Sequence, residues 1–292
     1  MDNTIESFWS GPIWNIPGTP WEIIGYSRAC YRTGFYIRHL DLMIDAGPQK
    51  SGNPKTILIT HCHADHIANV PFTLIEMDPA GGRVSSLPDI FVHEKSKTRL
   101  HNYIAAMFSA NYATDFKGSV ANYIPVKGSD VLDYTANNTK IRIEVFACTH
   151  DVPTVAYGIS TKKQRLKEEY FDLKGNAKAL VELKKKGIEI TETSYEPNIA
   201  FIWDTTIHIF RSNPGILKYP VIMIECTFLY DDDYEQSLTK KHIHWKSLRP
   251  HVVNNPDTIF VLIHFSLRYT EQEIAAFFKK EGLANVKPWL QI

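Results

Sequence analysis

Short apolar runs recur along this chain, and several of them stop at a side chain of a type that binds metals. Residues 56–60 read Thr-Ile-Leu-Ile-Thr, a β-branched and apolar stretch typical of a buried strand. Strands that end at one edge of a sheet would gather the side chains that follow them into one site. Further runs lie at 141–148, 199–203, 221–224 and 258–263, and the polar residues that follow them are His150, Asp204, Glu225 and His264.

The order of strands and helices predicts a layered α/β protein. Two strand-rich halves, each with helices outside, favour a four-layer αβ/βα sandwich of the α/β (α+β) class. No Pro/Gly/Ser-rich linker separates the halves, so we expect residues 1–292 to form a single domain. The other strands are expected at 21–24, 34–37, 42–44 and 90–92, and the helices at 67–76, 94–109 and 270–279, the last with a capping box of Thr270 and Glu273.

The run at 56–60 leads into the sequence Thr-His-Cys-His-Ala-Asp-His. In an extended turn, the first two histidines point to the same side and the cysteine between them points into the core. The aspartate and the last histidine follow a bend and would reach a different point, which favours two metal ions over one. The alternative is an exposed, histidine-rich loop that binds nothing. The candidate ligands are His61, His63, Asp65 and His66, and the cysteine is Cys62.

Composition limits the kind of partner and the compartment. The 32 basic and 32 acidic residues balance, so a polyanion would have to bind at a local site rather than through overall charge. The cysteines are far apart and show no Cys-x-x-Cys spacing, which argues against disulfides and favours a reducing compartment. Residues 1–6 show no targeting signal, and no apolar stretch is long enough for a membrane span. We therefore expect a cytoplasmic protein, with the nucleus as an alternative.

One segment departs from this balance. Residues 162–187 hold nine basic and four acidic side chains, a local excess of five positive charges. One interpretation is a solvated helix over residues 176–186, since most charged runs are exposed helix faces. The other is a basic insertion, at about 162–196, that contacts a nucleic acid.

Taken together, these motifs resemble the metallo-β-lactamase superfamily and, within it, the RNase Z branch of metal-dependent phosphodiesterases. The segment 60–66 alone indicates only the superfamily. The segments Glu-Cys-Thr-Phe at 225–228 and His-Phe-Ser-Leu-Arg-Tyr at 264–269 narrow the resemblance to RNase Z. The other segments that carry it are Asp-Ala-Gly at 45–47, the stretch 149–158 that includes His150, and Trp-Asp-Thr-Thr at 203–206.

The resemblance implies a role for each candidate residue. Two divalent ions would be bound, most readily zinc, although manganese and iron also suit such donors. Asp204 would bridge the ions, which would share a water that attacks the phosphorus as hydroxide. The first ion would be held by His61, His63 and His150, and the second by Asp65, His66 and His264. The catalytic residues would be Asp65, Glu225 and His242, and the substrate-binding residues Arg268 and Tyr269.

The resemblance also implies an activity, the endonucleolytic 3′ processing of precursor tRNA, and a homodimer. In RNase Z proteins an insertion after the ligand that matches His150 grips the tRNA. Residues 162–196 lack the Gly-Pro-rich hand that this insertion carries in the bacterial-type short enzymes. The insertion is therefore either a different, basic form of that arm, or a sign that the substrate is not tRNA. The alternative functions are hydrolysis of a small phosphodiester, thioester or lactone, and non-catalytic binding of RNA or metal.

Overall fold

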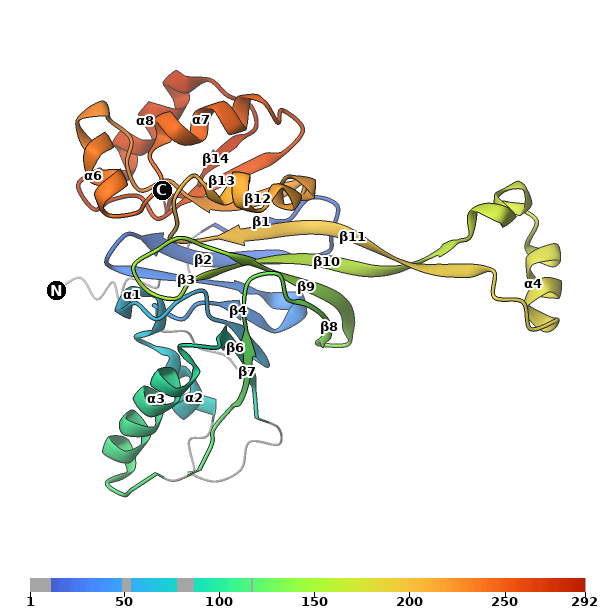
Figure 1. Ribbon diagram of the computed structural model, residues 1–292, viewed down its shortest axis with the longest axis horizontal. Coiled ribbons are helices and arrows are strands. Elements are labelled where there is room, and N and C mark those ends of the chain that lie inside the picture. The colour runs from blue at the N-terminus through green and yellow to red at the C-terminus, as the bar shows by residue number, and fades with distance from the viewer. Residues whose placement is uncertain (1–11, 49–53, 78–86, 117, 292) are drawn as a thin grey trace.

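Two β-sheets pack face to face, and helices cover their outer faces (Figure 1). The computed structural model describes residues 12–48, 54–77, 87–116 and 118–291, so the expectation for residues 1–6 lies outside the described part. Helices α2 (Val70–Met77) and α3 (Lys97–Tyr112) cover the first sheet, and α7 (Trp245–Val253) and α8 (Glu271–Glu281) cover the second. The predicted αβ/βα sandwich is confirmed. No helix among the described residues is long and apolar enough to cross a membrane.

The first sheet is built from the N-terminal half of the chain, in sequence order. Its first four strands are joined by antiparallel pairing and its last four by parallel pairing. The strands are β1 (Trp14–Asn15), β2 (Glu22–Arg28), β3 (Arg32–Ile37), β4 (Leu42–Ile44), β5 (Thr56–Leu58), β6 (Asp89–His93) and β7 (Asn122–Val126).

The second sheet repeats this pattern with the C-terminal half. Its first four strands pair antiparallel and its last four pair parallel. The strands are β8 (Val131–Ala136), β9 (Thr139–Ala147), β10 (Val155–Leu166), β11 (Thr191–Ile202), β12 (Val221–Glu225), β13 (Ile259–Ile263) and β14 (Val286–Pro288).

Three hydrophobic layers hold the sandwich together. One lies between the sheets and includes Phe35 and Trp203, and the other two lie between each sheet and its helices. Strands β12 and β13 read as continuous apolar runs because both of their faces are covered in this way. The parallel strands of both sheets therefore have buried ends, and the loops that leave their carboxyl ends carry all of the candidate ligands except His150, which lies between the antiparallel strands β9 and β10.

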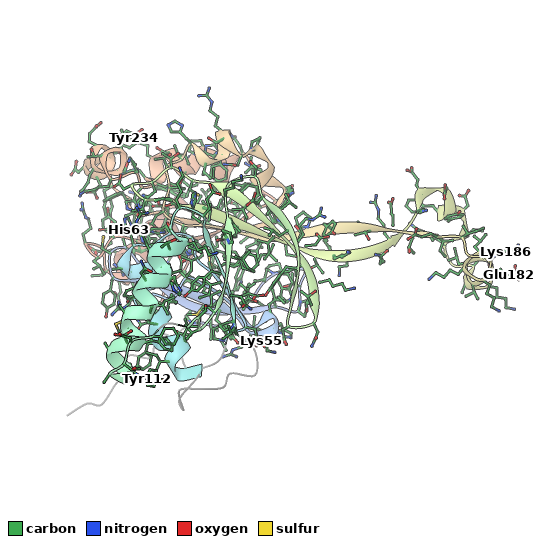
Figure 2. The ribbon with its side chains drawn as sticks, turned by 60° about the horizontal axis from the view of Figure 1, so that its bottom comes forward. Lys55, His63, Tyr112, Glu182, Lys186 and Tyr234 are labelled. Atoms are coloured by element: carbon green, nitrogen blue, oxygen red, sulfur yellow. The ribbon has the colours of Figure 1, made fainter. Side chains whose placement is uncertain are left out.

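A two-stranded arm leaves this body. Strands β10 and β11 pair over ten registered residue pairs, from Tyr157 opposite Phe201 to Leu166 opposite Thr191, and their far ends extend beyond the sheet (Figures 1 and 2). Helix α4 (Ala177–Lys185) lies at the tip, and Asn176 caps it by accepting a hydrogen bond from the Ala179 amide at 3.2 Å. The predicted helix at 176–186 is thus present, but strand β10 occupies residues 162–166.

The helix expected at 67–76 is divided in two. A short helix α1 (Ala64–Ile67) is followed by α2. The break coincides with Asn69, whose amide donates to the Ala46 carbonyl at 2.9 Å instead of continuing the helix. Helix α3 starts and ends three residues later than expected. The capping box of α8 is confirmed, with Thr270 and Glu273 bonded to one another's backbone amides.

Candidate metal centre

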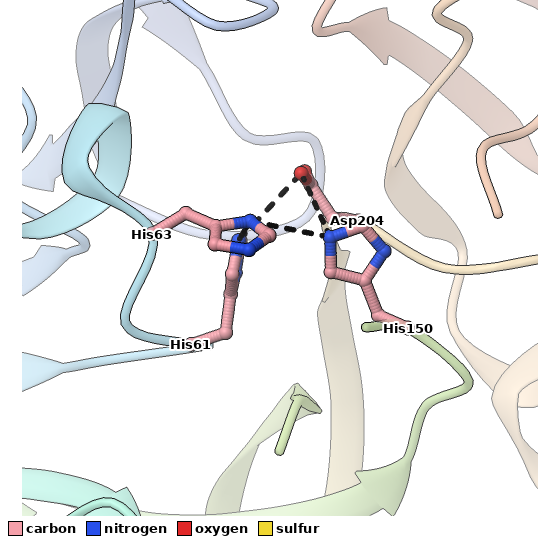
Figure 3. A group of neighbouring side chains, drawn as sticks. All are labelled: His61, His63, His150 and Asp204. Carbon is pink, nitrogen blue, oxygen red and sulfur yellow. Dashed lines mark hydrogen bonds and ion pairs between the residues drawn. The ribbon is translucent and has the colours of Figure 1, made fainter. Parts of the chain in front are cut away.

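A first donor group brings together three histidines from two loops. His61 and His63 follow β5, and His150 lies in the loop between β9 and β10. The Nδ1 atom of His63 lies 3.1 Å from Nε2 of His61 and 3.3 Å from Nε2 of His150. Figure 3 shows these rings facing one another and Asp204, which follows β11. Cys62 packs away from them against the helices of the first sheet, as expected.

A second donor group is formed by Asp65, His66 and His264. The Nε2 atoms of His66 and His264 lie 3.5 and 3.6 Å from the same oxygen, Oδ2 of Asp65. Both histidines are buried, and Asp65 is half-buried. The structure therefore places together the two sets of residues that the resemblance implied, and it separates them as the spacing of the motif suggested.

Asp204 lies between the two groups and presents one carboxylate oxygen to each. Its Oδ2 lies 3.6 Å from Nε2 of His61 and 3.7 Å from Nε2 of His150. Its Oδ1 lies 3.5 Å from Nε2 of His66 and 3.3 Å from Nε2 of His264. This division is the arrangement that a carboxylate bridging two cations requires.

The donor atoms fit divalent metal ions. Tetrahedral zinc with nitrogen ligands at 2.0–2.1 Å places neighbouring donors about 3.3 Å apart, and the donor contacts of both groups fall between 3.1 and 3.7 Å. Three buried donor atoms, Nε2 of His66, Nε2 of His264 and Oδ1 of Asp204, have no hydrogen-bond partner among the described residues. Because burial of such atoms without a partner is unfavourable, a bound cation accounts for them.

The electrostatics of the site also favour positive charge. Burial alone would lower the pKa of His66, but the carboxylates of Asp204 and Asp45 beside it raise that pKa to about 9. Burial would raise the pKa of Asp204, yet His264 and His66 hold it well below its usual range. The acids therefore favour positive charge at this point, and a divalent cation would supply it between the same groups.

Asp45, at the end of β4, supports the ligands from behind. One of its oxygens lies 2.7 Å from Nδ1 of His66. Its two oxygens also accept hydrogen bonds from Thr60, at 2.8 Å from the amide and 2.7 Å from the hydroxyl. The Thr60 hydroxyl in turn lies 3.1 Å from Nδ1 of His61. One carboxylate thus orients a histidine of each donor group, and such partners raise metal affinity.

Glu225 and His242 form a pair beside the donor groups. Nδ1 of His242 lies 3.0 and 3.1 Å from the two oxygens of Glu225, which is fully buried at the end of β12. The carboxylate also accepts from the amides of Thr205 at 2.7 Å and Ile243 at 3.1 Å. Burial alone would lower the pKa of His242, but the charge and hydrogen bond of Glu225 raise it to about 9. His242 can therefore carry a proton at neutral pH.

Thr227 connects this pair to the second donor group. Its hydroxyl donates to Glu225 at 2.6 Å and lies 3.1 Å from Nδ1 of His264. Sequence analysis assigned no role to Thr227 or to Asp45, although both lie in segments that carry the resemblance. The available signal was their position close to the end of a buried strand, with Asp45 directly after β4 and Thr227 two residues after β12.

The two predicted substrate-binding residues differ in exposure. Arg268 is exposed, and its guanidinium is bonded to Asp233 and, at 2.9 Å, to Gln236. Tyr269 is buried, and its hydroxyl donates to Asp233 and accepts from the Leu229 amide at 3.2 Å. Tyr269 thus holds a loop together rather than presenting its hydroxyl to the surface. A role of either residue in binding substrate stays a prediction.

His244, next to the paired His242, points elsewhere. It is buried, its Nε2 lies 2.8 Å from the Tyr230 carbonyl, and its Nδ1 accepts from the Lys246 amide to cap α7. Its contacts thus hold the start of α7 and the loop of Tyr230 in place.

A cavity of about 370 Å³ adjoins the first donor group. His150 lines it, as do His93 at the end of β6, Lys95 just after that strand, and Asp151, which is bonded to Lys241 at 2.5 Å. The lining therefore includes charged groups, and His150 belongs both to the cavity wall and to the first donor group. It offers room for part of a substrate beside the candidate centre.

Fold and donor set together define a metal-dependent hydrolase with the metallo-β-lactamase fold. No family model matches the chain. Among solved structures, the metallo-β-lactamase fold protein YhfI of Bacillus subtilis matches 91% of this chain and 94% of its own, at 12% identity and a TM-score of 0.56. The short form of human tRNase Z matches 90% and 93%, at 15% identity and a TM-score of 0.52. At these identities the structures establish the fold alone.

Sequence similarity carries the comparison further. Over 269 residues, 89% of each chain, the protein is 29% identical to a tRNase Z of Arabidopsis thaliana, TRZ1. The chloroplastic tRNase Z TRZ2 of the same plant is 28% identical over 87% of this chain and 70% of its own length. The predicted resemblance to RNase Z is confirmed.

Proposed function

We propose that this protein is a dinuclear metal-dependent phosphodiesterase that cleaves precursor tRNA at the 3′ side of the mature sequence. The observation that carries the proposal is the placement of Asp204 between two complete donor groups, with the Glu225–His242 pair beside them. The ring of His242 lies 5.2 Å from that of His150 and 5.4 Å from that of His264, measured between centroids. The similarity to plant tRNase Z proteins supports the choice of substrate.

The residues of the chain divide the reaction between them. Two divalent ions, most readily zinc, would supply a nucleophile at neutral pH and polarise the phosphate oxygens. Asp65 stays ionised, because its contacts with His264 and His66 outweigh burial and lower its pKa to about 2. His242 holds a proton beside the candidate centre and would give it to the departing sugar oxygen. Glu225 fixes the ring of His242 and stabilises its protonated form.

The arm would carry the tRNA. Along its two strands the charges are paired, since Arg165 lies 2.6 Å from Glu192 and Lys163 lies 3.7 Å from Glu196. Over residues 162–196, nine basic and seven acidic side chains leave an excess of only two. The excess is concentrated at the tip, where Glu182 is the one acid of residues 174–187 and the basic residues are Lys174, Lys178, Lys184, Lys185 and Lys186 (Figure 2 labels Glu182 and Lys186). Such a tip suits contact with phosphates far from the cleavage point.

Hydrolysis assays test the proposal directly. The purified, zinc-loaded protein is expected to cleave a precursor tRNA and the small diester bis(p-nitrophenyl) phosphate. The Asp204→Ala variant is expected to lose both bound metal and both activities, because it removes a donor from each group. A wild type that cleaves neither substrate would disprove the proposal. Cleavage of the diester alone would favour the second candidate, a hydrolase of small phosphodiesters.

Thioester and lactone hydrolases, the other members of the second candidate class, are expected to have a closed apolar pocket. The lining of the cavity beside His150 includes the charged residues Lys95 and Asp151, and Arg268 is exposed, so these observations favour a phosphodiester over a thioester or lactone. A non-catalytic role is less consistent with the complete donor set.

We also infer a single domain over residues 1–292 with an insertion at 162–196, a homodimer and a cytoplasmic location. The insertion within one domain is supported by strands β10 and β11, which run from the second sheet into the arm. Light scattering would measure the mass of the particle, and imaging of a tagged copy would locate it.

A further inference from the structure

The end of strand β2 holds the loop that carries His264, although the two segments are far apart in the sequence. The amide of His264 donates to the hydroxyl of Ser27 at 3.1 Å. The amide of Ala29 donates to the carbonyl of Phe265, also at 3.1 Å. The first half of the chain thus fixes the backbone on both sides of the peptide that joins His264 to Phe265.

Arg28 completes this contact with its side chain. Its Nε donates to the Phe265 carbonyl at 3.2 Å, and its Nη2 donates to the carbonyls of Ser266, at 2.8 Å, and Tyr269. The residue is 7% exposed. No ion pair joins it to a carboxylate within the part of the chain that the structure describes. One buried guanidinium therefore connects three carbonyl groups of the segment 265–269.

A buried cation that is not paired with a carboxylate is an unfavourable choice for a core position. Burial of an unpaired charge disfavours the folded state, and apolar residues of similar volume often stabilise as well or better. Other buried positions of β2, such as Ile23 and Ile24, are apolar. The benefit of an arginine at position 28 must come from what its planar fork can do, which is to hold several acceptors in a fixed arrangement.

The held loop needs such support at His264. This residue has a φ of 61°, in the left-handed region, which is unfavourable for a residue with a Cβ. In that conformation its Nε2 lies 3.3 Å from Oδ1 of Asp204 and 3.6 Å from Oδ2 of Asp65. If the backbone relaxed to a negative φ, Nε2 would leave the second donor group. The first group contains no residue of this loop and would be unaffected.

We propose that Arg28 is a positioning residue of the second donor group, where it keeps His264 in its left-handed, ligating conformation by holding the carbonyls that follow it. The inference rests on the proposed dinuclear centre. It predicts a selective effect. Loss of Arg28 should lower the affinity for the ion of the second donor group only, whereas a general loss of stability would lower the affinity for both ions.

The test compares Arg28→Met with Arg38→Met, a control in which the lost arginine is exposed and paired with Glu22 at 3.5 Å. Zinc per chain is measured after gel filtration, and the affinity for each ion is measured by competition with a chelator. Arg28→Met is expected to retain one ion and to bind the second at least about tenfold more weakly. Its kcat on bis(p-nitrophenyl) phosphate should fall about tenfold and recover as free zinc is raised, while Arg38→Met matches the wild type.

Arg28→Lys provides a second variant that keeps the charge but can reach fewer carbonyls, and it should show an intermediate affinity for the second ion. The inference would be overturned if Arg28→Met bound both ions with wild-type affinity, or if its affinity for both ions fell equally. If Arg28→Met does not fold, a folded Arg28→Lys with wild-type affinity for both ions overturns it. A wild-type protein that binds no metal and cleaves no diester would instead disprove the proposed function, and this inference with it.

Discussion

At the scale of single residues, the candidate centre depends on side chains that hold the donors as much as on the donors themselves. Asp45 is the clearest example. It is fully buried, has a left-handed φ of 53°, and contacts both His66 and Thr60. Gly47, two residues later, is equally constrained, because a Cβ there would lie 1.8 Å from the carbonyl oxygen of Asp65. The turn at 45–47 therefore places the carboxylate of Asp45 and the backbone of Gly47 against the segment 60–66.

Asp45→Asn is expected to weaken metal binding about 10- to 100-fold, because an amide cannot accept from both Thr60 and His66 in the same way. Competition with a chelator would measure the change. Asp41→Asn is the matched control, since Asp41 is also left-handed, with a φ of 45°, but contacts Lys55 at the opposite end of β4. Unchanged affinity in Asp45→Asn would contradict a supporting role.

His242→Asn should separate two substrates. Loss of the proton donor should lower kcat on precursor tRNA about 10²- to 10⁴-fold, because the departing sugar oxygen is strongly basic. The loss on bis(p-nitrophenyl) phosphate should be much smaller, because nitrophenolate departs without a proton. The control is His208→Asn, which changes an exposed histidine. Equal losses on both substrates would assign His242 to another role.

At the scale of elements, the arm and the loop that carries Tyr269 depend on contacts that no local pattern in the sequence predicts. The basic segment at 162–187 contains half of a strand pair and a capped helix, and acids on β11 neutralise its strand. That pairing could not be predicted, because Glu192 and Glu196 come later in the chain. Likewise, the burial of Tyr269 could not be predicted, because Asp233, in another loop, accepts a hydrogen bond from the tyrosine hydroxyl, while the role of Tyr269 in binding substrate stays a prediction.

An arm-deleted variant tests the role of the tip. Lys163 and Ser194 are cross-strand partners, so residues 164–193 can be replaced by an Asn-Gly turn without a change of register. The KM for precursor tRNA is expected to rise about tenfold or more, and the salt dependence of binding should become shallower. Activity on bis(p-nitrophenyl) phosphate should not change, and a variant with normal tRNA kinetics would exclude the arm from binding.

At the scale of the whole molecule, the two halves are alike. Both sheets have three antiparallel pairings followed by three parallel ones in chain order. Asp45 follows the fourth strand of the first sheet, and Asp204 follows the fourth strand of the second. The sequence shows no simple repeat, but the topology places an acid at the corresponding point in each half. The centre lies where the two halves meet.

The C-terminal segment joins these halves through Trp289. Its ring is 3% exposed, contacts Phe35 at a centroid distance of 5.2 Å, and donates to the Gly25 carbonyl of β2 at 3.0 Å. Trp289→Ala is expected to lower the free energy of unfolding by about 3–5 kcal/mol. Denaturation in urea would measure it, with Val131→Ala, at a position 55% exposed, as the control. A shift no larger than that of the control would contradict this role.

The sequence by itself determined the chemistry of the donors and their place at strand ends, because apolar runs, capping residues and the spacing of His61 to His66 are local properties. The tertiary structure alone decided how Asp204 divides its oxygens, why His264 is held in a left-handed conformation, and which charges of the arm are neutralised. Those features depend on contacts between distant segments. Ser27 and Arg28 reach the His264 loop across 237 to 241 positions, and no local pattern specifies such a contact.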